Sequence, residues 1–337
     1  MNFLSHRNFL IYILFLQLDL LRVVHGFVDI RNIGNYIKDG TTQVYYKVKN
    51  FASCPFTECC NDDYVIEDWQ ALQEDLKENL FGQNLAIKLL TKALKSHFNK
   101  LNRKKPLVIS LHGDVGTGKT FTSEIIAKHM FKEGSNSAFV HRFVAADFPY
   151  KHESHLPEYQ IFVIENVKAA LASCPRSLFI FDEVDKYQPG IFDLLTSYID
   201  HHRILNGIHF DQAIYVFISN LPLPHISEDL KSLYKAGKVR EQLDNSYFED
   251  LLKKKAFDLK GGLKSAAIIE GNLIDHYIPY LPLEKSHVKE CIRGFFAQYN
   301  RDPSEHGISK IFDENVVLDE DGIFAESGCK RIEKKVD

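Results

Sequence analysis

The sequence predicts an α/β fold in which helices flank a parallel sheet and a smaller, mainly helical domain follows at the C-terminus. Three observations lead to this prediction. Short apolar runs alternate along the chain with stretches of helical periodicity, which is the pattern of a parallel sheet. A glycine-rich turn follows the first of the apolar runs, at residues 107–111. A pair of acidic residues follows a later run, at residues 178–181.

The N-terminal segment has the features of a secretory signal peptide. The chain has 337 residues, and its segment 1–26 contains a weakly basic start, an almost wholly apolar run and small residues at Val24 and Gly26. These are the parts of a cleavable signal peptide. The apolar run is shorter than the roughly 20 residues that a membrane-spanning helix needs. A retained hydrophobic anchor and a buried N-terminal helix are the alternatives.

The segment 27–66 combines short β-type runs with the cysteine group CPFTECC. An even number of cysteines in an oxidising compartment favours disulfide pairing, although the sequence leaves the connectivity open. The spaced C-x-x-C pairs of a zinc site are absent from the sequence. The six cysteines are Cys54, Cys59, Cys60, Cys174, Cys291 and Cys329.

Helical periodicity begins near Glu67, and a second helix is expected after Gly82. Pro279 and Pro282 then mark a boundary between a large domain at 67–280 and a small domain at 281–337. Between these helices and that boundary, the pattern predicts strands at 107–111, 139–144, 178–181 and 213–219, and helices at 119–132, 161–173 and 189–199.

The strongest chemical signal fits the pattern G-x-x-x-x-G-K-[ST] at every fixed position. Its glycines let backbone N–H groups converge on one anion, and the following helix directs its positive end at the phosphates. Lys119 can reach the β- and γ-phosphates, and the Thr120 hydroxyl suits Mg²⁺. ATP and Mg²⁺ are therefore the expected cofactors. The phosphate-binding segment is Gly113, Asp114, Val115, Gly116, Thr117, Gly118, Lys119 and Thr120.

Two further signals lie at the ends of expected strands. Asp182 and Glu183 follow the run LFIF, and Asn220 ends the next strand. Ligands of such sheets sit beyond the carboxyl ends of the strands. We expect Asp182 to hold Mg²⁺, Glu183 to orient and deprotonate the attacking water, and Asn220 to hydrogen-bond the γ-phosphate and the water. Asp185 and Lys186 are interpreted as structural or surface residues.

Other function classes find little support. The formal net charge of -4 gives no strongly basic face for nucleic acid, which is not expected as a partner. The segment 152–155 reads HESH, one residue short of the zinc-protease pattern HExxH. His201, His202 and His209 are interpreted as parts of a solvated loop, and the G-x-S-x-G pattern of serine hydrolases does not occur.

The segments FGQNLAIKLL, GDVGTGKT, LFIFDEVDK and FISN together resemble the Clp/Hsp100-type AAA+ ATPases. The cysteine group CPFTECC, the segment YIPYLPLEKSHVKECIR and the terminal SGCK are similar to torsins in particular. The resemblance runs from about residue 54 to residue 330.

Torsin resemblance implies an ATPase of the endoplasmic reticulum lumen, including the perinuclear space, that remodels proteins or membranes. It also implies stimulation by a single-pass membrane activator whose luminal AAA-like domain supplies a missing arginine, and it allows a homo-oligomer. Lys330 falls on the second sensor of the γ-phosphate. Cys291 and Cys329 match a pair thought to couple redox state to nucleotide binding. Cys174 is a candidate partner for one of the cysteines of CPFTECC.

Two positions bear on how closely the family pattern applies. Torsins usually carry Asn where this chain has Thr120, the ordinary Mg²⁺ ligand of P-loops. Arg240 lies where some Clp-type relatives place an arginine finger, a role that the torsin pattern argues against. Two alternative functions follow, a nucleotide-gated binding scaffold with little turnover and a self-sufficient Clp-like unfoldase.

Overall fold

The computed structural model describes residues 57–99, 103–150, 152–201, 204–205, 207–220, 224–243, 245–258, 261–264 and 266–336. The expected signal peptide at 1–26, most of the segment 27–66, Cys54 and His202 lie outside the described residues. Within the described part of the chain, the helices are too short or too polar to cross a membrane.

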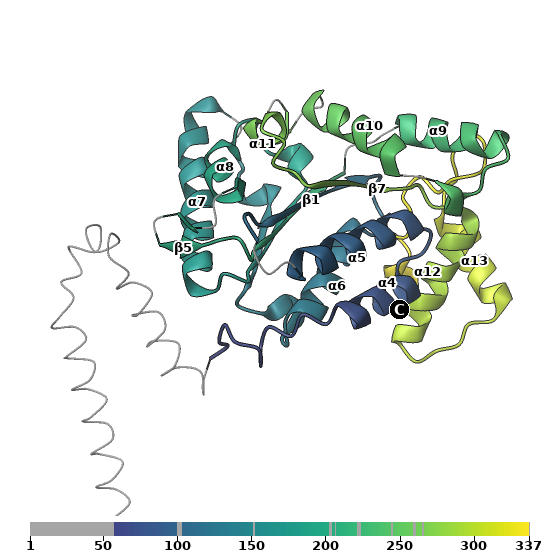
Figure 1. Ribbon diagram of the computed structural model, residues 1–337. Helices are drawn as coiled ribbons and strands as arrows, with labels where there is room; N and C mark the ends of the chain where they lie inside the picture. The colour runs from purple at the N-terminus through teal and green to yellow at the C-terminus, as the bar shows by residue number, and fades with distance from the viewer. Residues whose placement is uncertain are drawn as a thin grey trace, which may run out of the picture. The chain divides into compact units, whose positions relative to one another are not determined.

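The secondary structure alternates between strands and helices (Figure 1). The strands are β1 Leu107–Gly113, β2 Val140–Val144, β3 Leu178–Asp182, β4 Ile204–Leu205, β5 Ile208–His209, β6 Ile214–Ser219 and β7 His276–Tyr280. The helices are α4 Trp69–Asn79, α5 Asn84–Phe98, α6 Lys119–Met130, α7 Leu156–Ser173, α8 Thr196–Ile199, α9 Pro224–Lys235, α10 Asn245–Asp258, α11 Ala267–Glu270, α12 Lys285–Gln298, α13 Glu305–Asn315 and α14 Glu333–Val336.

Five strands form one parallel sheet in the order β2-β3-β6-β1-β7. The three central strands β1, β3 and β6 are buried along their whole length. That burial explains their continuous apolar sequences, because strands covered on both faces need no polar alternation. The predicted parallel α/β fold is confirmed.

Helices cover both faces of this sheet. One face packs against α4, α5 and α6, and the other packs against α7, α8, α9, α10 and α11 (Figure 1). Each face has its own apolar core, centred on Ile109 and Ile180 on the first side and on Phe181 and Phe217 on the second. The three-layer arrangement fixes the carboxyl ends of β1, β3 and β6 side by side.

The predicted helix at 189–199 is wrong in its first part. Gly190 has φ +86°, which an α-helix cannot contain. Only a 3-10 turn at Asp193–Leu195 and the short α8 form there. By contrast, α7 begins five residues before the expected 161, and Pro157 lies in its first turn, where a missing N–H is tolerated.

Strand β7 was not expected, because Pro279 was interpreted as a boundary marker. Among the described strands it lies at the edge of the sheet and pairs with β1 alone. Proline is tolerated in an edge strand, where one side of the backbone needs no ladder partner. The sheet therefore extends to Tyr280.

A separate apolar cluster forms after β7. It joins α12 and α13 through residues such as Leu283, Ile292 and Phe312, and it includes Ile332 near the C-terminus. A domain needs a core of its own. This cluster supports the division at 280/281, which we retain as a proposal.

Candidate nucleotide site

The glycine-rich turn connects the end of β1 to the start of α6. Gly116 and Gly118 have φ angles of +78° and +99°, which glycine adopts without the steric penalty of other residues. A Cβ atom on Gly116 would lie 2.0 Å from the carbonyl oxygen of Ser327. The turn thus requires glycine for its conformation and for its close contact with the C-terminal segment.

Lys119 is enclosed within this turn and is only 3% exposed. Its Nζ atom lies 2.8 Å from the carbonyl oxygen of Gly113 and 2.7 Å from that of Asp114. Burial lowers the pKa of the Lys119 ammonium to about 8, although the charges of Asp114 and Asp182 oppose the shift. Lys119 is therefore mostly cationic at neutral pH and stands at the positive end of α6, which suits an anionic ligand.

The structure brings together the two predicted magnesium ligands. The hydroxyl Oγ1 of Thr120 lies 3.2 Å from Oδ2 of Asp182, across 62 residues of sequence. Mg²⁺ prefers hard oxygen ligands and usually takes only one or two carboxylates from the protein. This pair, at the mouth of the phosphate-binding turn, fits that requirement.

Glu183 has an unusual backbone and an engaged side chain. Its φ of +57° is rare for a residue other than glycine, and its N–H donates to Oδ1 of Asp182 over 2.9 Å. The carboxylate Oε1 lies 2.6 Å from Nζ of Lys186. That hydrogen bond raises the pKa of Lys186. Lys186 is exposed, as its interpretation as a surface residue predicts, and it also pairs with the predicted catalytic carboxylate.

Asn220 lies at the end of β6, beside the end of β3. Its backbone N–H donates to Oδ1 of Asp185 over 2.8 Å. Asp185 therefore joins the turn after β3 to the end of β6, which is a structural role that the sequence analysis allowed. The predicted contact of the Asn220 side chain with phosphate and water stays a prediction.

The terminal SGCK segment packs directly on the phosphate-binding turn. The backbone N–H of Cys329 donates to the carbonyl oxygen of Gly116 over 3.0 Å. Gly328, with φ +50°, could not carry a side chain, because a Cβ atom would lie 2.3 Å from the same oxygen. The charge of Lys330 helps to lower the pKa of Lys119. The structure therefore places Lys330 near the P-loop.

Two disulfides involve predicted cysteines. Cys291 and Cys329 are joined, with Cα atoms 6.2 Å apart. Cys174 is joined to Cys60, which decides among the three partners that the sequence left open. Cys59 is also disulfide-bonded.

Gln83 is a residue at the site that the sequence analysis did not single out. It is 1% exposed, and its Nε2 donates to the carbonyl oxygens of Thr117 and Leu281 over 3.3 and 2.8 Å. Its Oε1 accepts from the N–H of Leu281 over 2.9 Å. The side chain therefore ties the phosphate-binding turn to the end of β7. The sequence signal that could have pointed to Gln83 is its place in the segment FGQNLAIKLL, which resembles Clp/Hsp100-type ATPases.

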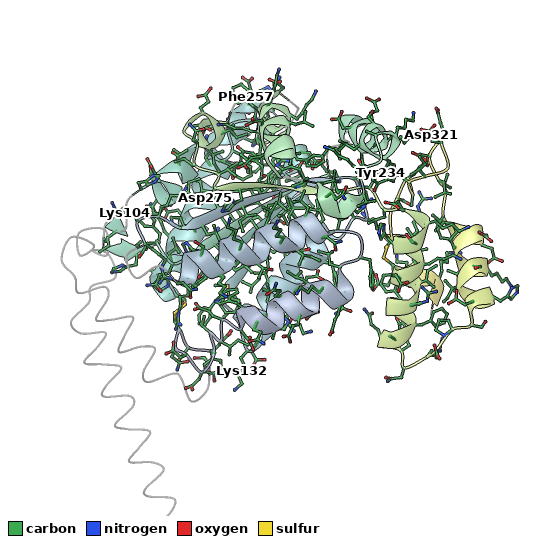
Figure 2. The ribbon with its side chains drawn as sticks, turned by 45° about the vertical axis from the view of Figure 1, so that its right-hand side comes forward. Lys104, Lys132, Tyr234, Phe257, Asp275 and Asp321 are labelled. Carbon is green, nitrogen blue, oxygen red and sulfur yellow. A yellow bond between two sulfur atoms is a disulfide. The ribbon has the colours of Figure 1, made fainter. Side chains whose placement is uncertain are left out.

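Arg240 is buried and bonded within its own chain. The residue is 6% exposed, and its guanidinium donates to the carbonyl oxygens of Gly82 and Pro282 over 2.7 and 2.6 Å. It also pairs with Glu284 at 3.0 Å, and the hydroxyl of Tyr234, labelled in Figure 2, donates to the same carboxylate. These contacts hold Arg240 inside its own chain and argue against the finger role, as the torsin pattern does.

The described histidines that resemble metal ligands have other partners. His152 accepts from the N–H of Ser154 in a short turn, and His155 stacks on Tyr150 with ring centroids 4.9 Å apart. Across the described residues, three or more potential metal-ligating side chains do not cluster anywhere.

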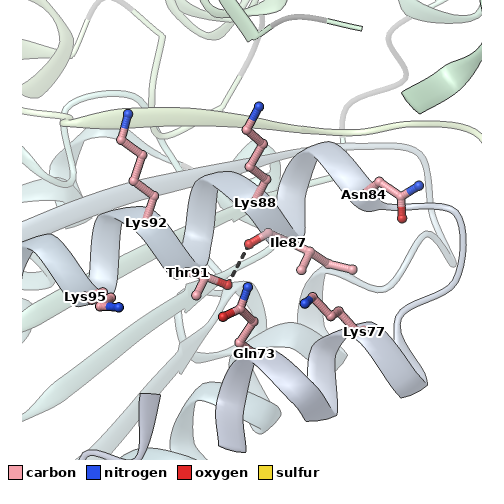
Figure 3. Close-up of a pocket in the computed structure, with 8 residues that line it drawn as sticks. All are labelled: Gln73, Lys77, Asn84, Ile87, Lys88, Thr91, Lys92 and Lys95. Carbon is pink, nitrogen blue, oxygen red and sulfur yellow. Dashed lines mark hydrogen bonds between the residues drawn. The ribbon is translucent and has the colours of Figure 1, made fainter. Parts of the chain in front are cut away.

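A groove between α4 and α5 is separate from this site (Figure 3). Its volume is about 590 Å³, and its lining includes Lys77, Lys88, Lys92 and Lys95. Lys88 and Lys92 point away from Lys77 on the other side of α5, as Figure 3 shows. Because the ammonium groups diverge, the groove offers no convergent contacts for a triphosphate.

The strand order, the P-loop after β1, the acidic pair after β3 and the polar end of β6 together define an AAA+ ATPase. The solved yeast Hsp104–ADP complex has the same fold, with a TM-score of 0.58, 16% identity and coverage of 80% of this chain. A closed-state reconstruction of Hsp104 with ATPγS and FITC casein matches with a TM-score of 0.56 and 16% identity. The chain spans just under half of each Hsp104 chain, 46% in both cases.

Sequence comparison identifies the branch. The profile of the family named Torsin matches residues 54–181. A Torsin-like protein of Drosophila melanogaster is 42% identical over 87% of both chains. A Torsin-like protein of Caenorhabditis elegans is 32% identical over 97% of this chain and 92% of its own. The chain belongs to the torsin family.

Proposed function

We propose that this protein is a Mg²⁺-dependent ATPase of the endoplasmic reticulum lumen and perinuclear space that remodels proteins or membranes when a membrane-bound activator stimulates it. The observation that carries the ATPase part is the convergence of Lys119, Thr120 and Asp182 at the ends of β1 and β3. The two disulfides support an oxidising compartment. The torsin family supports the lumen.

Each site residue has its own role in phosphoryl transfer. Lys119 and the first turn of α6 hold the β- and γ-phosphates. Thr120 and Asp182 hold Mg²⁺, which when bound neutralises charge on the phosphate oxygens. Glu183 orients a water and accepts its proton, and Asn220 fixes the direction of attack. Phosphoryl transfer depends mainly on positioning and charge stabilisation, which this arrangement supplies.

The engagement of Arg240 supports activator dependence. Its guanidinium is buried and hydrogen-bonded to the backbone of its own chain, which favours the torsin pattern, in which a second protein supplies the arginine finger. We propose a single-pass membrane protein with a luminal AAA-like domain as that partner. In GTPases an arginine finger is worth about 10³–10⁵ in rate.

One contact favours a second candidate function, a nucleotide-gated scaffold with little turnover. The carboxylate of Glu183 is paired with Lys186 at 2.6 Å, which keeps it from acting as a free base. In this candidate function, bound ATP sets the shape of the protein and hydrolysis is incidental.

The test is an ATPase assay of the purified protein, alone and with the luminal domain of a candidate activator. The proposal predicts slow turnover alone and stimulation of at least about tenfold. Glu183→Gln should bind ATP with unchanged affinity, lose turnover and trap the activator complex. Tight ATP binding without stimulation by any luminal activator would support the scaffold instead. Normal hydrolysis by Glu183→Gln would overturn the role of that carboxylate.

A further inference from the structure

Arg142 lies beside the predicted magnesium ligands, although nothing in the sequence analysis marked it. It is on β2, which pairs with β3 in a register that sets Arg142 beside Ile180 and Val144 beside Asp182. Residues two apart on a strand point to the same face of the sheet. Arg142 and Asp182 therefore project toward the face that α6 covers.

The contacts of the guanidinium define its place. Nη1 of Arg142 lies 3.4 Å from Oδ2 of Asp182, the same oxygen that accepts from the hydroxyl of Thr120 over 3.2 Å. Nη2 lies 3.7 Å from Oε1 of Glu124 on α6. The exposed fractions of the side chains are 31% for Arg142, 11% for Asp182 and 48% for Glu124. The better-buried of its two ion pairs is thus the one with the magnesium ligand.

We propose that Arg142 shares the Asp182 carboxylate with Mg²⁺ and thereby weakens the hold of the nucleotide site on its metal. The proposal rests on the proposed ATPase function, because it assumes that Thr120 and Asp182 receive Mg²⁺ with the nucleotide. Arg142 acts through Asp182 and is a positioning residue rather than a catalytic one.

Electrostatics gives the direction of the effect. An arginine side chain stays protonated at all physiological pH values, so its charge is permanent. A permanent cation on Oδ2 neutralises part of the negative field of Asp182, and it repels a divalent cation bound to the same carboxylate. Because the guanidinium is one-third exposed, water and salt screen the repulsion. The expected change in metal affinity is therefore modest, about threefold to tenfold.

Two other readings of Arg142 predict different behaviour. If its main partner were Glu124, the pair would be an exposed ion pair of small effect, and the metal would not respond to its removal. If Arg142 bound the triphosphate directly, its removal would weaken ATP binding even without metal. The metal dependence of binding separates these readings from the proposal.

The experiment measures Mn²⁺ binding to the purified protein saturated with ATPγS, using the loss of the free Mn²⁺ signal in electron paramagnetic resonance. Mn²⁺ stands in for Mg²⁺, and ATPγS affinity is measured separately by calorimetry with EDTA and with Mg²⁺. The variants are Arg142→Leu and Arg142→Lys. The control is Arg293→Leu, which removes an equal charge from an exposed pair with Glu290 on α12.

Arg142→Leu should bind Mn²⁺ about threefold to tenfold more tightly than the wild type. Arg142→Lys should stay within twofold of the wild type, and Arg293→Leu should not change. Unchanged or weaker Mn²⁺ binding by folded Arg142→Leu would overturn the proposal, as would an equal gain in Arg293→Leu. A wild-type protein that binds neither ATPγS nor Mn²⁺ would instead overturn the proposed function itself.

Discussion

Replacement of Arg240 by methionine tests whether this arginine is structural or catalytic. Methionine keeps an unbranched apolar stem of similar reach but cannot donate hydrogen bonds. The variant loses the donors to the carbonyl oxygens of Gly82 and Pro282 and leaves Glu284 without its cation. The contacts of Arg240 join the loop before α5 to the start of α12. Their loss should therefore weaken the packing of the apolar cluster of α12 and α13 against the large domain.

The structure sets the size of the effect. Removing one partner of a buried ion pair costs about 3–5 kcal/mol. The Glu284 side chain is 32% exposed, so water recovers part of its solvation, and the lower end, about 3 kcal/mol, applies. For a domain of this size, each kcal/mol lowers the Tm by about 2 °C, which gives a fall of about 6 °C.

The assay is thermal unfolding followed by near-ultraviolet circular dichroism, without nucleotide and at one protein concentration. Arg293→Met is the matched control, because the Arg293 guanidinium pairs with two exposed carboxylates, those of Glu290 on α12 and Glu305 on α13. The control should melt with the wild type. The structural role would be refuted by an Arg240→Met protein that had the Tm of the wild type but lost activator-stimulated turnover. That result would support the arginine-finger role instead.

Three further predictions follow from the site. The pKa of Lys119 near 8 predicts that ATP affinity falls by up to about tenfold per pH unit above pH 8, because the free Lys119 amine is neutral there and must take up a proton when phosphate binds. Calorimetry at several pH values measures this fall. Lys119→Met should bind ATP weakly and without this pH dependence. Cys291→Ser removes the disulfide to Cys329 and should weaken ATP binding severalfold, because the N–H of Cys329 would no longer be held on the carbonyl oxygen of Gly116. Dithiothreitol should weaken ATP binding equally in the wild type and have no effect on the variant. Gln83→Ala should lower the free energy of unfolding in urea by about 2 kcal/mol, because it leaves buried backbone groups unpaired; no change in the urea midpoint would contradict this.

Much of the candidate nucleotide site could be predicted from local sequence. The P-loop is continuous, and its glycines, Lys119 and Thr120 are fixed by a single turn. Asp182 and Asn220 were placed correctly at strand ends, because buried parallel strands have a recognisable composition and end at a shared edge. The pair Cys291 and Cys329 depended on family resemblance, and the structure joins it.

The missed features depend on long-range contacts. Gln83 meets Leu281 across 198 residues, and the guanidinium of Arg240 meets Gly82 across 158. A single glutamine or arginine gives no sequence signal of such partners. Arg142 lies in a strand in which Val140, His141 and Val144 are all half-buried, so the strand shows no clear alternation of buried and exposed residues from which the face of Arg142 could be predicted. Strand β7 was hidden because proline is read as a breaker unless the strand is known to be an edge.

The most direct test of the central claim is a structure of the protein with ATPγS and Mg²⁺. We predict the β- and γ-phosphates around Lys119 and the turn at Gly116, with the metal between the Thr120 hydroxyl and Asp182. A complex at saturating nucleotide with this pocket blocked by its own side chains, or with the nucleotide in the groove between α4 and α5, would contradict it.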